Sequence, residues 1–213
     1  MSEARTDWLR HPLVNVVVGF ILTGVLGTAI TQHFLDQRAK ETLQAQIALD
    51  RKKAVQQFSE LNESRKVRAE ILLHALRSGD DEELKSAKRE YEKAYVTWSV
   101  EQQGVLLLLR DLLAPEDHQL VKARLEEVLV GKIFDPLRSC LTAGYDHRND
   151  RAAASKALDD CRANELLERS GTCGRALAGA VSDLAGAHSA WASEGQSAEL
   201  RKRARDSIQQ ACP

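Results

Sequence analysis

The chain has 213 residues, of which 30 are basic and 31 acidic, and its net charge is −1. This balance excludes a strongly basic nucleic-acid binder and an acidic disordered tail. Hydrophobic residues make up 43% of the chain but aromatic residues only 5%, which favours aliphatic, alanine-rich helix packing over a sheet. The composition therefore predicts an all-α protein without a nucleic-acid partner.

The first predicted element is the uncharged apolar segment 13–30, with the sequence LVNVVVGFILTGVLGTAI. As a helix it spans roughly 27 Å, enough to cross the hydrocarbon core of a bilayer. A secretory signal peptide is the competing interpretation, but its apolar region is shorter and ends at a cleavage site flanked by small residues. We therefore predict a single-pass transmembrane helix at 13–33, contacting the lipid bilayer, after a short N-terminal tail at 1–12.

One face of this segment carries polar and small residues at every fourth position. Small residues at this spacing let helix backbones approach closely, and a buried asparagine hydrogen-bonds across such an interface. The alternative is that glycine and threonine are simply common in membrane helices. The pattern predicts a homo-oligomer that associates through a membrane face formed by Asn15, Gly19, Thr23, Gly27 and Thr31.

Residues 34–114 have helical periodicity and are predicted to form a long antiparallel hairpin of the coiled-coil type. The first helix continues the membrane helix to about Ser78, and Gly79 ends it. Asp80 and Glu83 have the spacing of an N-terminal capping box, and the second helix stops before Pro115. The apolar stripe of the first helix comprises Leu43, Ile47, Ala54, Phe58, Leu61, Leu72 and Leu76; that of the second comprises Leu84, Ala87, Tyr91, Ala94, Tyr95, Trp98, Val105, Leu109 and Leu112.

Residues 115–213 are predicted to complete the same extramembrane domain as a helical bundle. Glu116 and Asp117 are interpreted as first-turn acids of a third helix that reaches about Phe134. Asp135 and Pro136 then restart the chain as a new helix. Further helices are expected at about 151–170, 172–193 and 198–211, separated by Gly171 and by a turn at 194–197.

An arginine lies within the apolar stripe of the first long helix. Arg65 falls near the centre of the stripe and Arg68 on its edge. If the hairpin turns at Gly79 and Asp80, position 65 faces about position 94, so the guanidinium can stack on aromatic rings of the second helix. Two interpretations remain open: a packing and register device inside the bundle, or an anion site for a ligand or partner. The residues involved are Arg65, Arg68, Tyr91, Tyr95 and Trp98.

All four cysteines lie between positions 140 and 212, without the clustering typical of zinc sites. Behind a membrane anchor, an even number of cysteines indicates two disulfides in an oxidising compartment. Cys140 and Cys161 flank a predicted turn and are expected to pair, leaving Cys173 to pair with Cys212. Two other connectivities are possible, and buried free thiols are a further alternative.

The charge distribution predicts the opposite membrane orientation, in which the helical domain lies outside any oxidising compartment. Only Arg5 and Arg10 precede the membrane segment, whereas basic residues such as Arg38 and Lys40 follow it, and the positive-inside rule then places the helical domain in the cytoplasm. The cysteines favour a periplasmic or extracellular domain on the plasma (inner) membrane. Both locations stay open at this point.

The sequence contains no motif that predicts catalysis. It has no glycine-rich phosphate loop, no HExxH and no GxSxG, so we expect neither an enzyme nor a cofactor or metal site. The basic run Arg201, Lys202, Arg203 and Arg205 is interpreted as a solvated helix face, with an anionic lipid or partner surface as the alternative.

The architecture resembles two families of small membrane proteins. A short tail, one membrane helix, long helices and the near-terminal Cys212 resemble phage inner-membrane spanins. A single membrane helix before a helical domain also resembles small membrane effectors of CRISPR and related antiphage systems, which assemble into rings. We therefore expect a membrane-anchored scaffold or adaptor that acts through an unknown protein partner and self-association. The alternative is an oligomeric effector that perforates or perturbs the bilayer.

Overall fold

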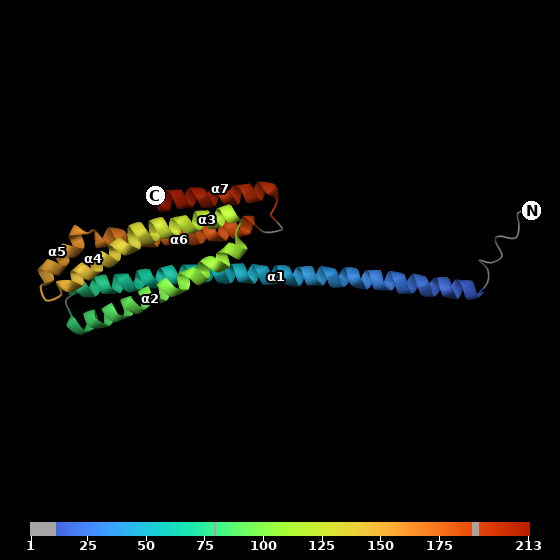
Figure 1. Ribbon diagram of the computed structural model, residues 1–213, viewed down its shortest axis with the longest axis horizontal. Helices are drawn as coiled ribbons and strands as arrows, with labels where there is room; N and C mark the ends of the chain where they lie inside the picture. The colour runs from blue at the N-terminus through green and yellow to red at the C-terminus, as the bar shows by residue number, and fades with distance from the viewer. Residues whose placement is uncertain (1–11, 79, 189–191) are drawn as a thin grey trace, which may run out of the picture. The chain divides into compact units, whose positions relative to one another are not determined.

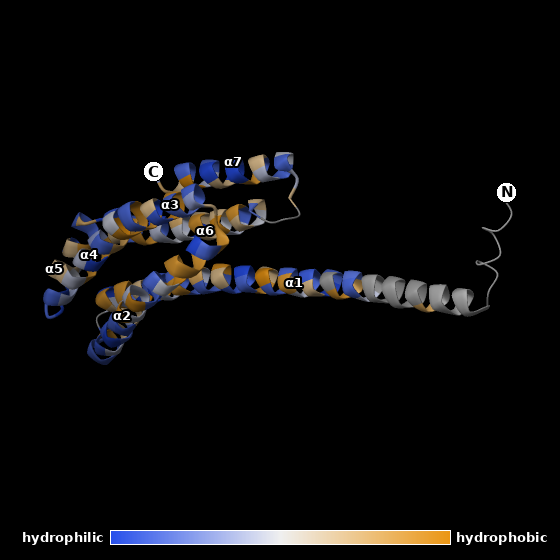
Figure 2. Cartoon of the chain, turned by 45° about the vertical axis from the view of Figure 1, so that its right-hand side comes forward, coloured by the Kyte–Doolittle hydropathy of each residue, from blue (hydrophilic) through white to orange (hydrophobic). Residues whose placement is uncertain are grey.

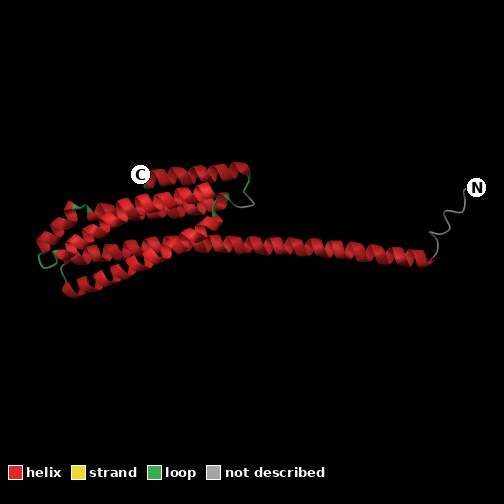
Figure 3. Ribbon diagram, viewed as in Figure 1, coloured by secondary structure: helices red, strands yellow, loops and turns green. Residues whose placement is uncertain are grey.

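The computed structural model describes residues 12–78, 80–188 and 192–213, and every regular element in these ranges is a helix (Figures 1 and 3). The described part of the chain contains no strand. The all-α prediction is therefore confirmed. The chain divides into two compact units, Met1–Leu49 and Asp50–Pro213, which are described separately.

Helix α1 runs without interruption from Pro12 to Ser78, so the predicted continuity of the first helix is confirmed. The tail at 1–11 and the side chains at 12–19 and 21–30 lie outside the described residues, and with them most of the predicted membrane segment and membrane face. Thr31, at the end of that face, is exposed. Among the residues that were described, no helix is both long and apolar enough for a membrane crossing.

The apolar stripe of α1 is buried only within the unit that begins at Asp50. Ala54, Phe58 and Leu72 have almost no exposed surface. Leu43 and Ile47, which belong to the predicted apolar stripe, are however exposed. The reason is that the core against which α1 packs belongs to the second unit, and these two residues precede it.

The hairpin turn and the second helix follow the sequence pattern. Helix α2 comprises Asp81–Leu112, and the Asp80 side chain caps it by accepting hydrogen bonds of 3.0 Å from the backbone N–H groups of Glu82 and Glu83. Such a cap satisfies N–H groups that have no partner within the helix. Most of the predicted inner face is buried, and Ala94, Tyr95 and Leu112 are half-buried.

The next helical run corrects the prediction of a restart at Asp135 and Pro136. Helix α3 (Pro115–Ala123) leads into a π-helix, η2 (Arg124–Phe134), and this into α4 (Asp135–Asp146), with Asp135 in helical geometry. Proline normally disrupts a helix because it lacks an N–H group and clashes with an earlier carbonyl. Here Pro136 lies in the first turn after the wider π segment, where the helix changes its hydrogen-bonding pattern and tolerates the missing donor.

The last three helices correct two more predicted boundaries. They are α5 (Arg151–Asp160), α6 (Ala163–Ala187) and α7 (Glu194–Ala211). The chain turns at Arg162, which has a left-handed backbone with φ 58°, and Gly171 lies inside α6. A Cβ at Gly171 would come within 3.0 Å of the Lys66 side chain, so this glycine serves close packing of α6 on α1. Positions 194–197 are the first turn of α7, which Ser193 and Gln196 begin with a capping box.

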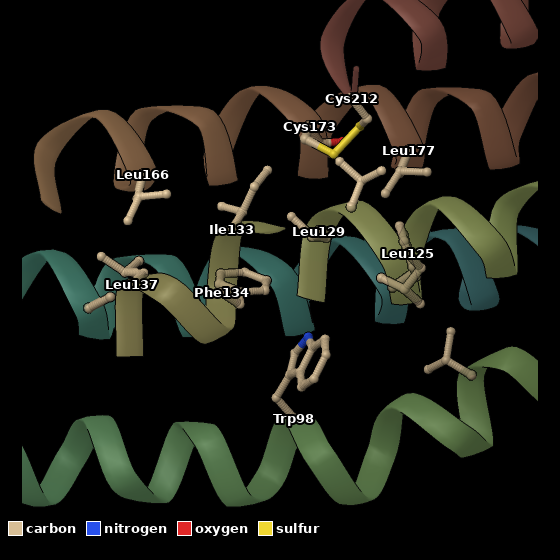
Figure 4. Packing of buried hydrophobic residues seen from close by; sticks show 14 of the residues in the cluster. Trp98, Leu125, Leu129, Ile133, Phe134, Leu137, Leu166, Cys173, Leu177 and Cys212 are labelled. Carbon is tan, nitrogen blue, oxygen red and sulfur yellow. A yellow bond between two sulfur atoms is a disulfide. The ribbon is translucent and has the colours of Figure 1, made fainter. Parts of the chain in front are cut away.

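The core of the second unit is aliphatic, as the composition predicted. Side chains from α1, α2, η2, α4 and α6 interdigitate around Leu129, Ile133 and Leu177 (Figure 4). Helices α6 and α7 pack closely together. The aromatic contribution to this core is concentrated at one place, around Arg65.

Candidate functional site

Arg65 is the largest fully buried side chain in the described part of the chain, with an exposed fraction of 1%. It lies on the inner stripe of α1, between Phe58 and Leu72. The hairpin turn at Asp80 brings the middle of α2 opposite it. Burying a charged side chain is costly unless its surroundings stabilise the charge, and the guanidinium therefore defines the site.

Three aromatic rings surround the guanidinium. Its central carbon lies 4.2 Å from the ring centroid of Trp98, 4.0 Å from that of Phe134 and 5.2 Å from that of Tyr95. The rings of Trp98 and Phe134 meet edge to face, with centroids 5.7 Å apart at 67°, and Figure 4 shows both pointing into the core. We call Arg65, Tyr95, Trp98 and Phe134 the aromatic box. Each ring face attracts the cation through its quadrupole.

No hydrogen bond of ordinary geometry reaches the three guanidinium nitrogens from the described residues. Burial lowers the pKa of Arg65 below its usual value, whereas the nearby Tyr91, Asp135 and Tyr95 side chains act in the opposite direction. The same burial raises the pKa of Tyr91, and the charges of Arg65 and Arg138 oppose that rise. Ring faces, the Tyr91 side chain and the nearby Asp135 carboxylate, rather than a direct ion pair, therefore stabilise this charge.

A second layer of contacts fixes the Trp98 ring. Its Nε1–H donates to Oδ1 of the buried Asn62 at 3.3 Å, and Nδ2 of Asn62 donates to the Phe58 carbonyl at 2.9 Å. These bonds satisfy the polar atoms of both side chains, which is required of buried polar groups. The indole face is thereby held toward Arg65.

On the outer side, the aromatic box reaches the surface through a second arginine. The guanidinium carbon of Arg138, an exposed residue of α4, lies 4.0 Å from the Tyr95 ring centroid. Tyr95 is half-buried and therefore contacts both cations. The two arginines and one ring join α1, α2 and α4, which makes this cluster a junction of helices distant in sequence.

The structure brings together most of the residues that were predicted to surround Arg65 and adds Phe134 to them. Arg65 meets Tyr95 and Trp98 through ring contacts and Tyr91 through electrostatics. Arg68 is half-buried and interacts elsewhere: a hydrogen bond from Lys93 lowers the pKa of Glu90, and the charge of Arg68 adds to that effect.

Phe134 was missed because it lies at the end of a π-helix. On an ideal α-helix Phe134 would point about 140° away from Leu129. In η2 the hydrogen bonds join residues five apart, so these two side chains come to the same side. In the sequence, only the spacing of the apolar residues across 121–137 indicates this π-helix, because it departs from the regular period of an α-helix.

The cysteines form the two predicted disulfides. Cys140 is bonded to Cys161, with Cα atoms 5.8 Å apart, and Cys173 to Cys212, with Cα atoms 5.0 Å apart. The first bond joins α4 to the turn after α5. The second joins the middle of α6 to the end of α7 (Figure 4). No described cysteine is free.

A buried carboxylate was also missed. Asp117, interpreted from sequence as a first-turn acid, is fully buried, and its Oδ2 atom accepts a hydrogen bond of 3.1 Å from Nε of Arg201. Nη2 of Arg205 lies 3.8 Å from Oδ1. Arg201 of the basic run on α7 is half-buried against Asp117, which the predicted solvated face did not include, whereas Arg205 is exposed. Lys202 and Arg203 are exposed.

A surface groove lies between α1 and α6, with Glu83 of α2 at its margin, and Arg65 is not among its lining residues. It has a volume of about 520 Å³, and Val67, Ile71, His74 and Leu167 line part of it. Among the described residues, no group of three histidine, cysteine or acidic side chains could hold a metal ion. The groove offers an apolar surface with charged margins.

Comparisons of the chain with known protein families, with curated proteins and with solved structures find no match. Its function is therefore inferred from its own residues.

Proposed function

We propose that the protein is a single-pass, membrane-anchored helical scaffold or adaptor, whose disulfide-stabilised bundle acts through protein-protein interaction and self-association. The observation that carries the proposal is the combination of an 18-residue uncharged apolar segment at 13–30 with two disulfides in the helical unit that follows it. Disulfides persist in oxidising compartments and are rare in the cytosol.

The disulfides favour an extracellular or periplasmic bundle over a cytoplasmic one. The positive-inside count that supports a cytoplasmic bundle depends on few residues close to the apolar segment. Two disulfides at Cα distances typical of such bonds support the opposite orientation. The bundle then lies on the oxidising side of the plasma (inner) membrane.

The buried cluster supports a structural role for Arg65. Its guanidinium is enclosed by three rings and does not line the groove at Val67 and Ile71. A ligand anion would need space beside the guanidinium, whereas ring faces occupy it. We therefore assign Arg65 to the packing and register of α1, α2 and η2, and assign partner binding to the surface.

Membrane anchoring is tested by extracting cell membranes with alkaline carbonate. The wild-type chain is expected to stay in the pellet. A variant with Val17→Arg and Leu22→Arg, which places two charges in the apolar segment, is expected to appear in the supernatant, because each charge at the bilayer centre is unfavourable by about 3 kcal/mol. A matched pair in the bundle, Val67→Arg and Ile71→Arg, is expected to stay in the pellet. Extraction of the wild-type chain would overturn the anchor.

The alternative function is an oligomeric membrane effector, and the polar and small membrane face from Asn15 to Thr31 favours it. Such a face can line a contact between many protomers. The two functions differ in oligomer size and in leakage: an effector forms large rings and releases dye from vesicles, whereas a scaffold forms small oligomers and leaves vesicles intact.

A further inference from the structure

The outer face of α2 carries an uncovered apolar ridge. Val96, Val100 and Leu108 are 58%, 70% and 47% exposed. Together with Gly104, these three residues lie four positions apart and form one continuous row on the helix surface. Leu107, beside this row, is 55% exposed. Hydrophobic residues dominate the C-terminal turns of α2 (Figure 2). We call Val96, Val100, Gly104 and Leu108 the α2 ridge.

Gly104 is not required by the fold of its own chain. A Cβ placed there would meet no atom within 4 Å, so a larger residue would fit. Glycine lowers helix stability relative to alanine in a helix interior. At the centre of an exposed apolar row, its effect is to leave a notch into which a side chain of another helix can fit.

The ridge is complementary to itself when two copies run antiparallel. Around a midpoint at Gln102, Val100 and Gly104 lie two residues to either side, so the valine of each copy meets the glycine notch of the other. Val96 and Leu108 lie six residues to either side and also face each other. A two-fold interface requires this kind of self-complementarity.

The charges at the two ends of the ridge favour the same arrangement. Lys93 and Asp111 each lie nine residues from the midpoint, so antiparallel pairing places them opposite each other. A parallel pair would instead oppose lysine to lysine and leave the glycine notches empty. Both side chains are largely exposed, at 72% and 73%, and their ion pairs within the chain leave them accessible.

We propose that α2 pairs antiparallel with α2 of a second copy of this chain through the α2 ridge. This contact uses the bundle and is separate from self-association through the membrane face, which joins copies of the same orientation. Because residues 50–78 of α1 run antiparallel to α2, these segments of the two copies point in opposite directions. The contact is small compared with standard interfaces, so we expect a dissociation constant of about micromolar order.

The first test compares two glycine variants of the full chain in detergent by sedimentation. Gly104→Leu is expected to raise the dimer dissociation constant at least about tenfold, because the leucine fills the notch. Gly179→Leu is the matched control, since Gly179 on α6 is also exposed and a Cβ there would meet no atom within 4 Å, but it lies between Arg175 and Asp183. Equal effects of the two variants, or a wild-type monomer at all concentrations, would overturn the proposal.

The second test is a charge exchange, which identifies the partner as a second copy. Lys93→Asp and Asp111→Lys are each expected to weaken the dimer about threefold or more, and the double variant to restore it. A double variant as weak as the single ones would contradict antiparallel pairing. Near-unchanged thermal transitions, expected for exposed positions, show that each variant folds.

The two proposals fail in different ways. A chain that stays in carbonate-treated membranes but whose oligomer ignores Gly104→Leu retains the anchor and loses the ridge. A chain that carbonate extracts but that dimerises through Gly104 retains the ridge and loses the anchor.

Discussion

Among the described residues of the bundle, Arg65 and Asp117 are buried charges, and they are stabilised in different ways. Arg65 lies among the rings of Tyr95, Trp98 and Phe134, and no described residue forms an ion pair with it. Asp117 receives a hydrogen bond from Arg201 and lies near Arg205. The first charge is enclosed by π faces and the second by opposite charges.

The difference follows from the chemistry of the two ions. A guanidinium is planar, delocalised and weakly hydrated, so ring faces replace much of its solvation. A carboxylate is an acceptor that needs donors; Arg201 of α7 donates to Oδ2, and Arg205 adds a positive charge 3.8 Å from Oδ1. Asp117 therefore depends on a distant helix, which the Cys173–Cys212 disulfide joins to α6.

The largest effect is expected when the sign of the charge in the aromatic box is reversed. Arg65→Glu places an anion against the rings and near Asp135, so we expect a loss of about 4 kcal/mol in the free energy of unfolding. Arg65→Met is the control; it retains volume without charge and is expected to change stability by about 1 kcal/mol or less. Denaturant unfolding measures both. Equal stability of the two variants would show that the box does not respond to charge.

The next effect concerns the carboxylate. Arg201→Ala with Arg205→Ala leaves Asp117 buried without its cations, and we expect a cost of about 3 kcal/mol. Asp117→Asn leaves two arginines that are partly exposed and can be hydrated, so its cost should be smaller. Chemical denaturation of both variants tests this asymmetry. If Asp117→Asn were the more destabilising change, Asp117 would not depend on α7 for its charge.

A smaller effect measures the cation–ring contact itself. In a double-mutant cycle, Arg65→Met and Phe134→Leu are expected to show a coupling of about 2 kcal/mol, because the ring and the guanidinium are both desolvated. Arg65→Met with Leu177→Ala serves as the control, since Leu177 lies on α6 and is not one of the rings around the guanidinium. A coupling near zero for Arg65 and Phe134 would contradict the aromatic box.

The smallest effect is a pH dependence at Tyr91. Burial raises the pKa of Tyr91 in the folded state, so at alkaline pH the unfolded chain releases this proton before the folded one does. Stability from this group is full below about pH 10 and falls as the pH rises further, by at most about 1.4 kcal/mol per pH unit. Tyr91→Phe should flatten this part of the profile, measured by urea unfolding at pH 8 to 11. An unchanged slope would contradict the effect.

The sequence predicted the contacts that depend on local register. The turn at Asp80 and the helical period of α1 and α2 were sufficient to place Arg65 near Tyr95 and Trp98. The cysteine pairs were also anticipated, because Cys140 and Cys161 flank one turn and only one pair then remains.

Other features depend on packing between distant segments. Phe134 reaches the box through a π-helix, which α-helical periodicity does not predict. A glycine at position 171 suggested a helix break, but this glycine lies inside α6, where it allows the close approach of the Lys66 side chain. The burial of Asp117 is set by α7, 84 residues away in the sequence, and a first-turn acid has the same local pattern whether it is exposed or paired.

The most direct test of the account is cysteine labelling of the full chain in intact cells with a membrane-impermeant maleimide. We predict no labelling without reductant, and labelling of Cys140, Cys161, Cys173 and Cys212 in intact cells once a membrane-impermeant reductant and a mild denaturant expose the thiols. Four thiols that react without reductant, and only after the cells are permeabilised, would contradict a membrane-anchored, disulfide-stabilised bundle on the oxidising side.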